Sequence, residues 1–249
     1  MTRFVGILSG KGGVAKTTTV VNLGAAMNYF GRDVTIVDGN LSTPHLGIHL
    51  GVPVVPISLH DALSGRNSLT EAMYLHQSGM KIIPAGLSLK DLIEVDHSKL
   101  KEVLPTLEGL TDIVLVDASA GLSGEASAVL DCVQDVIVIT NPELPAVTDA
   151  LKTIKLAESK GKNVRGIIVA KTGDVTDIPV ENIAALLEKP ILAIIPFDKS
   201  IRQSLIKKDP VIYTNPTSKS AIAYKKLAAD LIGMEYKVEK SSWYKFWKK

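Results

Sequence analysis

One short segment constrains the fold of this chain more than any other feature. It reads Ser9-Gly10-Lys11-Gly12-Gly13-Val14-Ala15-Lys16-Thr17-Thr18. An apolar run, residues 4–8, precedes it, and a helical pattern that ends at Gly31 follows it. A glycine-rich turn between a buried strand and a helix gathers backbone N–H groups, the positive end of the helix dipole and the charge of Lys16 at one point. The stretch therefore predicts a phosphate-binding loop, although Ala15 stands where the G-x-x-x-x-G-K-[ST] pattern has glycine.

The rest of the chain alternates between apolar runs and helical patterns. Runs rich in Val and Ile lie at 4–8, 34–37, 112–116, 136–139, 164–170 and 191–195, with a weaker edge-strand candidate at 81–83. Helices are expected at 16–30, 98–109, 145–160 and 219–232, and two short ones between 58 and 75. Strands of this composition are buried on both faces. The pattern predicts an α/β fold with a doubly wound, mainly parallel sheet and helices on both of its faces.

Length and charge favour one large domain with a basic tail. At 249 residues the chain is long enough to bury a sizeable core. We assign residues 1–233 to the α/β domain and 234–249 to a linker and tail. The formal net charge is +2, and residues 237–249 carry +4, which leaves −2 for the remainder. One cysteine, Cys132, excludes an intramolecular disulfide. With no apolar run long enough to span a membrane and no signal-peptide pattern, a cytoplasmic protein is expected.

Polar residues follow the predicted strands at the point where each strand ends. They are Asp38, Asp117, the segment 140–143, Lys171 and the segment 196–198. Parallel sheets bind ligands outside the carboxyl ends of their strands. These residues are therefore expected to line one rim together with the glycine-rich loop.

The chemistry that suits this rim is phosphoryl transfer, which depends on positioning and charge neutralisation. Lys16 is expected to reach the β- and γ-phosphates. The hydroxyl of Thr17, with Asp38 and Asp117 nearby, is the predicted Mg²⁺ site, Asp117 acting through the water shell of the ion. Gly121 is expected to present its backbone N–H to the γ-phosphate. Asp38 is the remaining carboxylate that can position or deprotonate the attacking water.

With Lys11 added to Lys16, the loop resembles the deviant Walker A motif, K-G-G-x-G-K-[ST], of the MinD/ParA family of ATPases. Residues 38–40 and 117–121 resemble its switch I and switch II segments. The T-N-P-E of residues 140–143 makes the MinD type the better match, and the I-P-x-D pattern at 195–198 resembles the segment near the adenine pocket. The resemblance covers nearly the whole chain.

The resemblance implies a cell-division or positioning ATPase that binds Mg-ATP, dimerises around it and releases ADP and phosphate. Lys11 of one subunit would then reach the phosphates held by the other. The nucleotide-binding residues expected on this basis are Gly10, Lys11, Gly12, Gly13, Val14, Ala15, Lys16, Thr17, Thr18, Gly121, Lys171, Pro196 and Asp198. The expected catalytic residues are Lys16, Asp38, Asn40 and Lys11.

Four departures from the family pattern bear on the activity. Ala15 places a Cβ in the cradle, which strains the loop unless its φ is negative. Asn40 stands where MinD proteins usually have a second aspartate, and asparagine can orient a water but cannot take its proton, so slow hydrolysis is expected. Ser119 replaces the switch II proline. No side-chain amide stands next to Lys171 to read adenine, so backbone groups near Lys171 and Pro196 are the candidates.

The tail combines aromatic and basic residues on two faces of a predicted helix. Trp243, Phe246 and Trp247 share one face, and Lys245, Lys248 and Lys249 share another. Such a segment is typical of an interfacial helix on anionic lipid, and it is similar in kind to the MinD membrane-targeting tail. Two copies in an ATP-bound dimer bind more strongly than one. This predicts peripheral membrane association in the ATP-bound state.

Several alternatives stay open. Ala15 and Asn40 are also compatible with a nucleotide-gated scaffold that hydrolyses little ATP. With either function, a partner protein is expected to bind the switch segments and residues 58–75. ParA-like partitioning on DNA conflicts with the charge of −2 outside the tail. An iron–sulfur carrier from a related branch is disfavoured by the lone Cys132. His45 and His49 are four residues apart, but no third metal ligand accompanies them.

Overall fold

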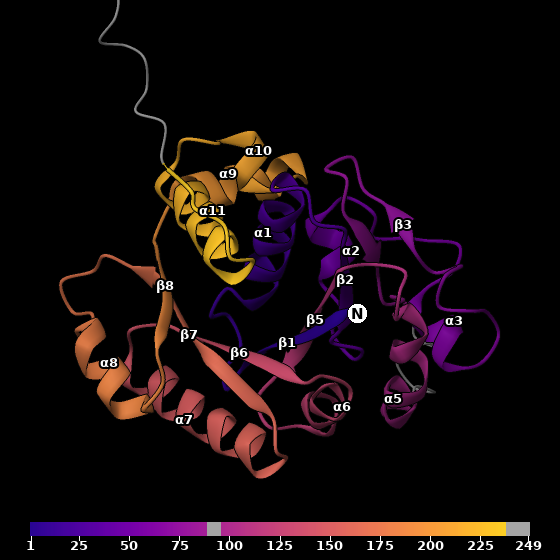
Figure 1. Ribbon diagram of the computed structural model, residues 1–249, viewed down its shortest axis with the longest axis horizontal. Coiled ribbons are helices and arrows are strands. Elements are labelled where there is room, and N and C mark those ends of the chain that lie inside the picture. The colour runs from indigo at the N-terminus through magenta and orange to yellow at the C-terminus, as the bar shows by residue number, and fades with distance from the viewer. Residues whose placement is uncertain (89–95, 238–249) are drawn as a thin grey trace, which may run out of the picture.

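A computed structural model describes residues 1–88 and 96–237, and within them eight strands form one sheet (Figure 1). Its order is β3-β4-β2-β5-β1-β6-β7-β8, and only β3 is antiparallel to its neighbour among these strands. The strands are β1 (Arg3–Ser9), β2 (Val34–Gly39), β3 (Tyr74–Leu75), β4 (Lys81–Ile83), β5 (Ile113–Ala120), β6 (Asp135–Thr140), β7 (Asn163–Thr172) and β8 (Ile191–Pro196). The predicted α/β fold is confirmed.

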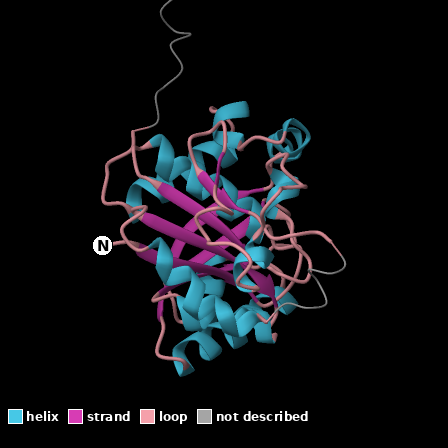
Figure 2. Cartoon of the chain, turned by 90° about the vertical axis from the view of Figure 1, so that its right-hand side faces the viewer, coloured by secondary structure: helices cyan, strands magenta, loops and turns pink. Residues whose placement is uncertain are grey.

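Helices cover both faces of the sheet. Figure 1 shows α1 and α9–α11 on one face and α5–α8 on the other, and Figure 2 shows the strands enclosed between helices. The helices are α1 (Lys16–Tyr29), α2 (Leu46–His49), α3 (Leu59–Leu63), α5 (Leu100–Val103), α6 (Gly124–Cys132), α7 (Leu144–Ser159), α8 (Val180–Leu187), α9 (Lys199–Lys207), α10 (Val211–Thr214) and α11 (Lys219–Leu231). No helix within the described ranges is both long and apolar enough to cross a bilayer.

Each apolar strand contributes side chains to two hydrophobic clusters, one on each face of the sheet, because successive side chains point to opposite faces. In β1, Val5 and Ile7 belong to the cluster formed with α1 and α11. Phe4 and Leu8 belong to the cluster formed with α6 and α7. The same alternation recurs in β5 and β6. This explains why these strands read as continuous apolar runs rather than as polar–apolar alternation.

Several predicted helices are confirmed, and they end where the sequence indicated. Gly31 follows α1 with φ 83° and Gly233 follows α11 with φ 72°, the left-handed conformation that glycine adopts without strain. Helix α7 carries Pro145 in its first turn, where a missing N–H costs nothing. Ser58 and Asp61 form a capping box at the start of α3, one of the two short helices expected between 58 and 75.

Two helix predictions are wrong in part. Ser68 and Glu71 make one of the two hydrogen bonds of a capping box, in which Ser68 N donates to Glu71 Oε2 over 2.7 Å, and the Ser68 hydroxyl donates to the same oxygen. The segment is only a turn. The chain leaves it at once to pair Tyr74 with β4, which makes β3 rather than β4 the sheet edge. The helix expected at 98–109 is one turn of α-helix between two 3₁₀ turns, because Pro105 cannot donate a helical hydrogen bond.

The glycine-rich loop lies where the order of the strands reverses. It follows β1, which lies between β5 and β6, so the chain crosses to either side of this strand. Open α/β sheets bind ligands at such a point. Close packing fixes one glycine of the loop, since a Cβ on Gly10 would come within 2.3 Å of the carbonyl oxygen of Asp149 in α7.

Candidate functional site

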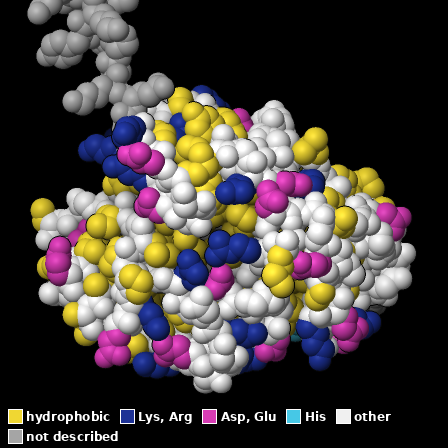
Figure 3. Space-filling view, viewed as in Figure 1, with side chains coloured by type: hydrophobic (Ala, Val, Ile, Leu, Met, Phe, Trp, Pro, Cys, Tyr) yellow, Lys and Arg dark blue, Asp and Glu magenta, His cyan; other side chains and the backbone are white. Residues whose placement is uncertain are grey.

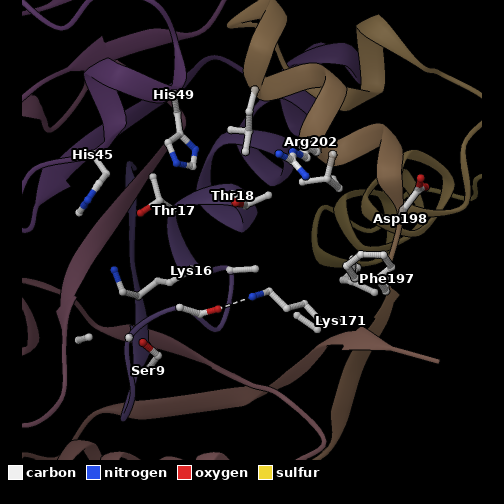
Figure 4. Close-up of a pocket in the computed structure, with 18 of the residues that line it drawn as sticks. Ser9, Lys16, Thr17, Thr18, His45, His49, Lys171, Phe197, Asp198 and Arg202 are labelled. Carbon is white, nitrogen blue, oxygen red and sulfur yellow. Dashed lines mark hydrogen bonds between the residues drawn. The ribbon is translucent and has the colours of Figure 1, made fainter. Parts of the chain in front are cut away.

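A cavity of about 770 Å³ opens outside the carboxyl ends of the strands (Figure 4). Three parts of the chain make most of its lining: the glycine-rich loop with the start of α1, the segment from Asn40 to His49, and a wall made by the end of β8 and by α9. The ends of β5 and β7 and Tyr224 of α11 complete it. Fold topology brings these segments together, because the lining residues run from Ser9 to Tyr224 in the sequence. The cavity is large enough for a small-molecule ligand.

Lys16 and Thr17 share a buried carboxylate at one end of this cavity. Lys16 Nζ lies 2.6 Å from Asp117 Oδ1 and also donates to the carbonyl of Ala118. Thr17 Oγ1 donates to Asp117 Oδ2. Lys16 is 8% exposed and Asp117 is fully buried, so the pair is shielded from solvent. Residues from two separate motifs, the glycine-rich loop and the aspartate that follows a buried strand, therefore meet in one hydrogen-bonded group.

Asp38 occupies a place different from the one expected for a group that positions water. It is fully buried and lies outside the set of side chains that line the cavity. Its carboxylate accepts the backbone N–H groups of Leu46 (2.9 Å), His45 (3.0 Å) and Asn40 (3.3 Å), and so folds the segment that follows β2. Burial, followed by the nearby charge of Asp117, raises the pKa of Asp38 to about 7.

Gly121 and Lys11 also make contacts that the sequence does not indicate. The N–H of Gly121 donates to the carbonyl of Ser9 (2.9 Å), so it ties β5 to the loop and, contrary to expectation, is not directed at the cavity. Lys11 lines the mouth of the cavity with its side chain 47% exposed, and its Nζ lies 3.6 Å from Glu143 Oε2. Both contacts hold the loop against neighbouring strand ends.

Two residues of the cavity wall adopt the left-handed backbone conformation without being glycine. Ala15 has φ 74° at the start of α1, so the strained alternative anticipated for this position is the one present. Lys171 has φ 61° at the end of β7, and its Nζ donates to the carbonyl of Gly13 over 2.6 Å. Figure 4 shows the Lys171 side chain directed across the cavity toward the loop. Such strain is often retained at functional sites.

Asn40 lines the cavity, but its side chain is engaged within its own loop. Its Nδ2 donates to the carbonyl of Thr43, and its Oδ1 accepts from Thr43 Oγ1 at 3.0 Å. These bonds close a tight turn after β2. Asn40 is 8% exposed.

The opposite end of the cavity is mostly apolar. Ile195, Pro196, Phe197, Ile201 and Leu205 line it, and Phe197 is 69% exposed. On the face seen in Figure 3, Lys and Arg side chains gather among apolar ones near the centre, below α9 and α11. An apolar wall with a few basic groups suits a flat aromatic ligand attached to an anionic group.

Asp198 has a structural position at this end. Its carboxylate accepts from the N–H of Ser200 (2.8 Å), so Asp198 caps α9. It also accepts from the N–H (3.1 Å) and the hydroxyl (2.8 Å) of Ser220 in the first turn of α11. Partial burial raises its pKa, but these hydrogen bonds outweigh burial and lower the pKa of Asp198 to about 2. The carboxylate thus holds two helices beside the cavity.

Most of the residues predicted for the site line the cavity, and some do not. Lys11, Gly12, Gly13, Ala15, Lys16, Thr17, Thr18, Asn40, Lys171, Pro196 and Asp198 are among the lining residues. Gly10, Val14, Asp38, Asp117 and Gly121 lie behind it, and Val14 is part of the core. Thr43, Tyr224 and residues of α9 also line the cavity, but no sequence motif predicts them. Trp243, Phe246, Trp247 and the tail lysines lie outside the described residues.

The donor set fits a hard cation. Thr17 offers a hydroxyl oxygen to the cavity and Asp117 a carboxylate immediately behind it, and Mg²⁺ prefers oxygen ligands, keeping several of its waters. A separate site formed by His45 and His49 lacks a third ligand: among residues 1–88 and 96–237, no group of three or more His, Cys, Asp or Glu side chains could hold a metal ion.

Comparison with known proteins gives one consistent result. The family model described as ParA, NUBPL iron-transfer P-loop NTPase, matches residues 1–232. An uncharacterized ATP-binding protein of Methanocaldococcus jannaschii is 33% identical over 236 residues, which cover 94% of this chain and 89% of that protein. The septum site-determining protein MinD of Synechocystis is 28% identical over 244 residues, 94% of this chain and 91% of that protein. MinD of Pyrococcus horikoshii, solved as a complex with Mg-ADP, aligns with TM-score 0.90 and 37% identity over 96% of this chain and 100% of that one.

Proposed function

The chain belongs to the ParA family of P-loop NTPases, with MinD proteins among its relatives, and we propose that it is an ATPase that binds Mg-ATP in the described cavity. The observation that carries this proposal is the group formed by Lys16, Thr17 and Asp117 at the start of α1. A helix N-terminus, a glycine-rich loop and a buried lysine together favour a triphosphate over any uncharged ligand.

The reaction is attack of water on the γ-phosphorus, which breaks the bond to the β–γ bridging oxygen and releases ADP and phosphate. Lys16 neutralises charge on the transferred group, and the loop amides hold the phosphate chain in line. Thr17 would supply a ligand to Mg²⁺, and Asp117 would orient its bound water. Held there, the ion would supply charge neutralisation for the phosphates. Asp38 acts by fixing the segment that carries Asn40.

Hydrolysis is slow in this proposal. Asn40 is the polar side chain of the switch segment that reaches the cavity, and an amide cannot accept the proton of the attacking water. A second candidate function follows from the same residue: a nucleotide-gated scaffold that binds ATP and barely turns it over. The two candidates share the binding site and differ only in rate.

The active form in this proposal is a homodimer that encloses two nucleotides. Lys11 supports it, because the side chain is half exposed at the cavity mouth and pairs with Glu143 rather than with the phosphate end of its own cavity. An exposed lysine at this place is free to reach a second subunit once its weak ion pair is broken. Glu143 is itself 58% exposed.

Membrane association and a protein partner complete the proposal. The aromatic and basic residues of 243–249 support reversible binding to anionic lipid, which the dimer strengthens by carrying two tails. The relatives named as septum site-determining proteins support a role in positioning other proteins, through a partner bound on the switch segments and residues 58–75.

Phosphate release tests the enzymatic proposal. Release by the wild-type protein should depend on Mg²⁺ and rise more steeply than in proportion to protein concentration, because the dimer is the active species. Lys16→Ala should abolish it. Turnover per subunit that is independent of concentration would contradict the dimer, and release by Lys16→Ala at the wild-type rate would contradict the site.

Sedimentation with vesicles tests the membrane proposal. Full-length protein and a chain ending at residue 237 are mixed with vesicles rich in anionic lipid, with and without ATP. ATP should increase the pelleted fraction of the full-length protein alone. Equal pelleting with and without ATP would refute an ATP-controlled membrane switch.

A further inference from the structure

Two side chains that no phosphate-binding motif includes face the start of α1 from opposite sides. His49 ends α2 and lines the cavity, and Arg202 of α9 lines it from the other wall. Figure 4 shows the His49 ring pointing toward Thr17 and Thr18, with Thr18 between His49 and Arg202. These two side chains therefore lie on either side of the first turn of the helix.

The ring of His49 has an unused hydrogen-bonding position. Its Nδ1 is buried and has no hydrogen-bond partner in the part of the chain that the structure describes. A buried N–H without an acceptor is costly, so the favoured tautomer keeps the lone pair at Nδ1 and the proton at Nε2. Burial also lowers the pKa of His49, which favours the neutral ring. Nε2–H is then the donor that the ring can offer to a ligand.

The position of the two side chains identifies the part of a nucleotide that they meet. The lysine of a phosphate-binding loop reaches the β- and γ-phosphates, and the hydroxyl that follows it binds Mg²⁺. The apolar wall at Phe197 and Leu205 suits the base. Thr18 lies between these two ends (Figure 4). In a nucleotide that spans the cavity, the α-phosphate therefore lies near His49 and Arg202.

We propose that His49 is a nucleotide-positioning residue that donates a hydrogen bond to the α-phosphate, which Arg202 neutralises from the opposite side. This inference rests on the proposed function, since it concerns the same nucleotide. ATP and ADP share the α-phosphate, so the contact strengthens the binding of both equally. Such uniform binding lowers KM without changing kcat.

Calorimetric titration with ADP and with ATP tests the proposal. His49→Leu removes the donor at similar size, and it should weaken the binding of both nucleotides by about tenfold, as expected for a hydrogen bond to a charged group. His49→Gln keeps an N–H donor and should stay within about threefold of the wild type. His97→Leu is the matched control, because His97 also has an unpartnered buried Nδ1 but lies outside the cavity. It should bind like the wild type.

A purely structural role for His49 predicts a different result. If His49 only supports the fold, His49→Leu should lower the melting temperature enough to account for the weaker binding, and that result would overturn the proposal. If His49 positions the nucleotide, replacing its unpartnered buried nitrogen by Leu should leave the melting temperature unchanged or raise it. ADP with sulfur in place of an α-phosphate oxygen gives a second test. It should bind the wild type more weakly than ADP does, and His49→Leu should lose this difference.

The outcomes separate this inference from the proposed function. If the wild type binds neither nucleotide, the proposed function fails. If the wild type binds both and Lys16→Ala binds neither, but His49→Leu equals the wild type, only the role of His49 fails. A loss confined to ATP would place the contact on the γ-phosphate and overturn the assignment to the α-phosphate.

Discussion

The two ends of the cavity are built in opposite ways: the end at Lys16, proposed for the phosphates and called the phosphate end, and the end at Phe197, proposed for the base and called the base end. At the phosphate end, Lys16 and Asp117 are withdrawn from solvent and bonded to each other, and Thr17 shares the same carboxylate. At the base end the wall is apolar and Phe197 is 69% exposed. Asp198 at this end accepts its hydrogen bonds from residues of α9 and α11. Charged interactions in a buried site are stronger than those at an open surface.

This difference indicates how the site divides its tasks. In the proposed ATPase, the phosphate end, with fixed charges and little solvent, would supply most of the binding free energy and all of the chemistry. The base end supplies shape and holds α9 and α11 in place. Changes at the phosphate end should therefore alter affinity and turnover, whereas changes at the base end should alter stability more than affinity.

After Lys16→Ala, the largest effect is expected for Thr17→Val. Loss of a Mg²⁺ ligand next to Asp117 should weaken ATP binding by about tenfold to a hundredfold when Mg²⁺ is present, because a contact to a charged group is removed. Titration calorimetry with Mg²⁺ and with EDTA measures this, and the EDTA value should not change. Thr148→Val, on the exposed face of α7, is the control. An unchanged affinity with Mg²⁺ would remove Thr17 from the metal site.

Asn40→Asp should raise the rate of phosphate release by about tenfold or more, because a carboxylate can accept a proton that an amide cannot. ATP affinity should change little. Steady-state phosphate release measures the rate, and Asn40→Ala provides the matched loss of the contacts with Thr43. If Asn40→Asp is as slow as the wild type, the slow turnover has another origin.

Asp198→Ala should lower the free energy of unfolding by less than about 1 kcal/mol at neutral pH, since the carboxylate is partly exposed and its interactions are screened. The folded pKa of about 2 lies below the unfolded value of 3.8, so the stabilisation is complete above pH 3.8 and disappears as the pH falls through 2. Urea unfolding from pH 7 down to pH 2 checks this. A difference from the wild type that is constant over this range would refute the role of the charged carboxylate.

Ala15→Gly has the smallest expected effect. Release of left-handed strain stabilises the folded loop by about 1–2 kcal/mol, and the greater freedom of glycine in the unfolded chain offsets part of it. The free energy of unfolding should rise by less than about 1 kcal/mol in urea titrations. Ala185→Gly, in the regular helix α8, should lower it by about 1 kcal/mol. The same sign for both variants would contradict the strain at Ala15.

Much of the fold and of the phosphate end could be predicted from the sequence, for physical reasons. The strands are long apolar runs, and Gly31 and Gly233 mark helix ends because their φ values are positive. The loop and Asp117 follow strands directly, so sequence order fixes their place at the sheet edge. The second of the two short helices expected between 58 and 75 is only a turn, which Ser68 and Glu71 close. The helix expected at 98–109 is broken up because Pro105 interrupts it.

The base end and the exact role of each acid could not be predicted in the same way. The wall is made by α9, which carries no motif, and its side chains act through shape. Nothing in the sequence indicates that the oxygens of Asp38 accept three backbone N–H groups, or that the N–H of Gly121 bonds to Ser9. Such contacts depend on loop geometry between distant segments. In the sequence, His49 is distinguished only by its spacing from His45.

Calorimetric titration of the wild type and of Lys16→Ala with ADP and Mg²⁺ tests the central claim most directly. The wild type should bind one ADP per chain. Lys16→Ala should bind at least about a hundredfold more weakly, because the buried cation that faces the phosphates is lost. Binding of ADP by Lys16→Ala with the wild-type affinity, or no binding by the wild type, would contradict the assignment of this cavity to a nucleotide.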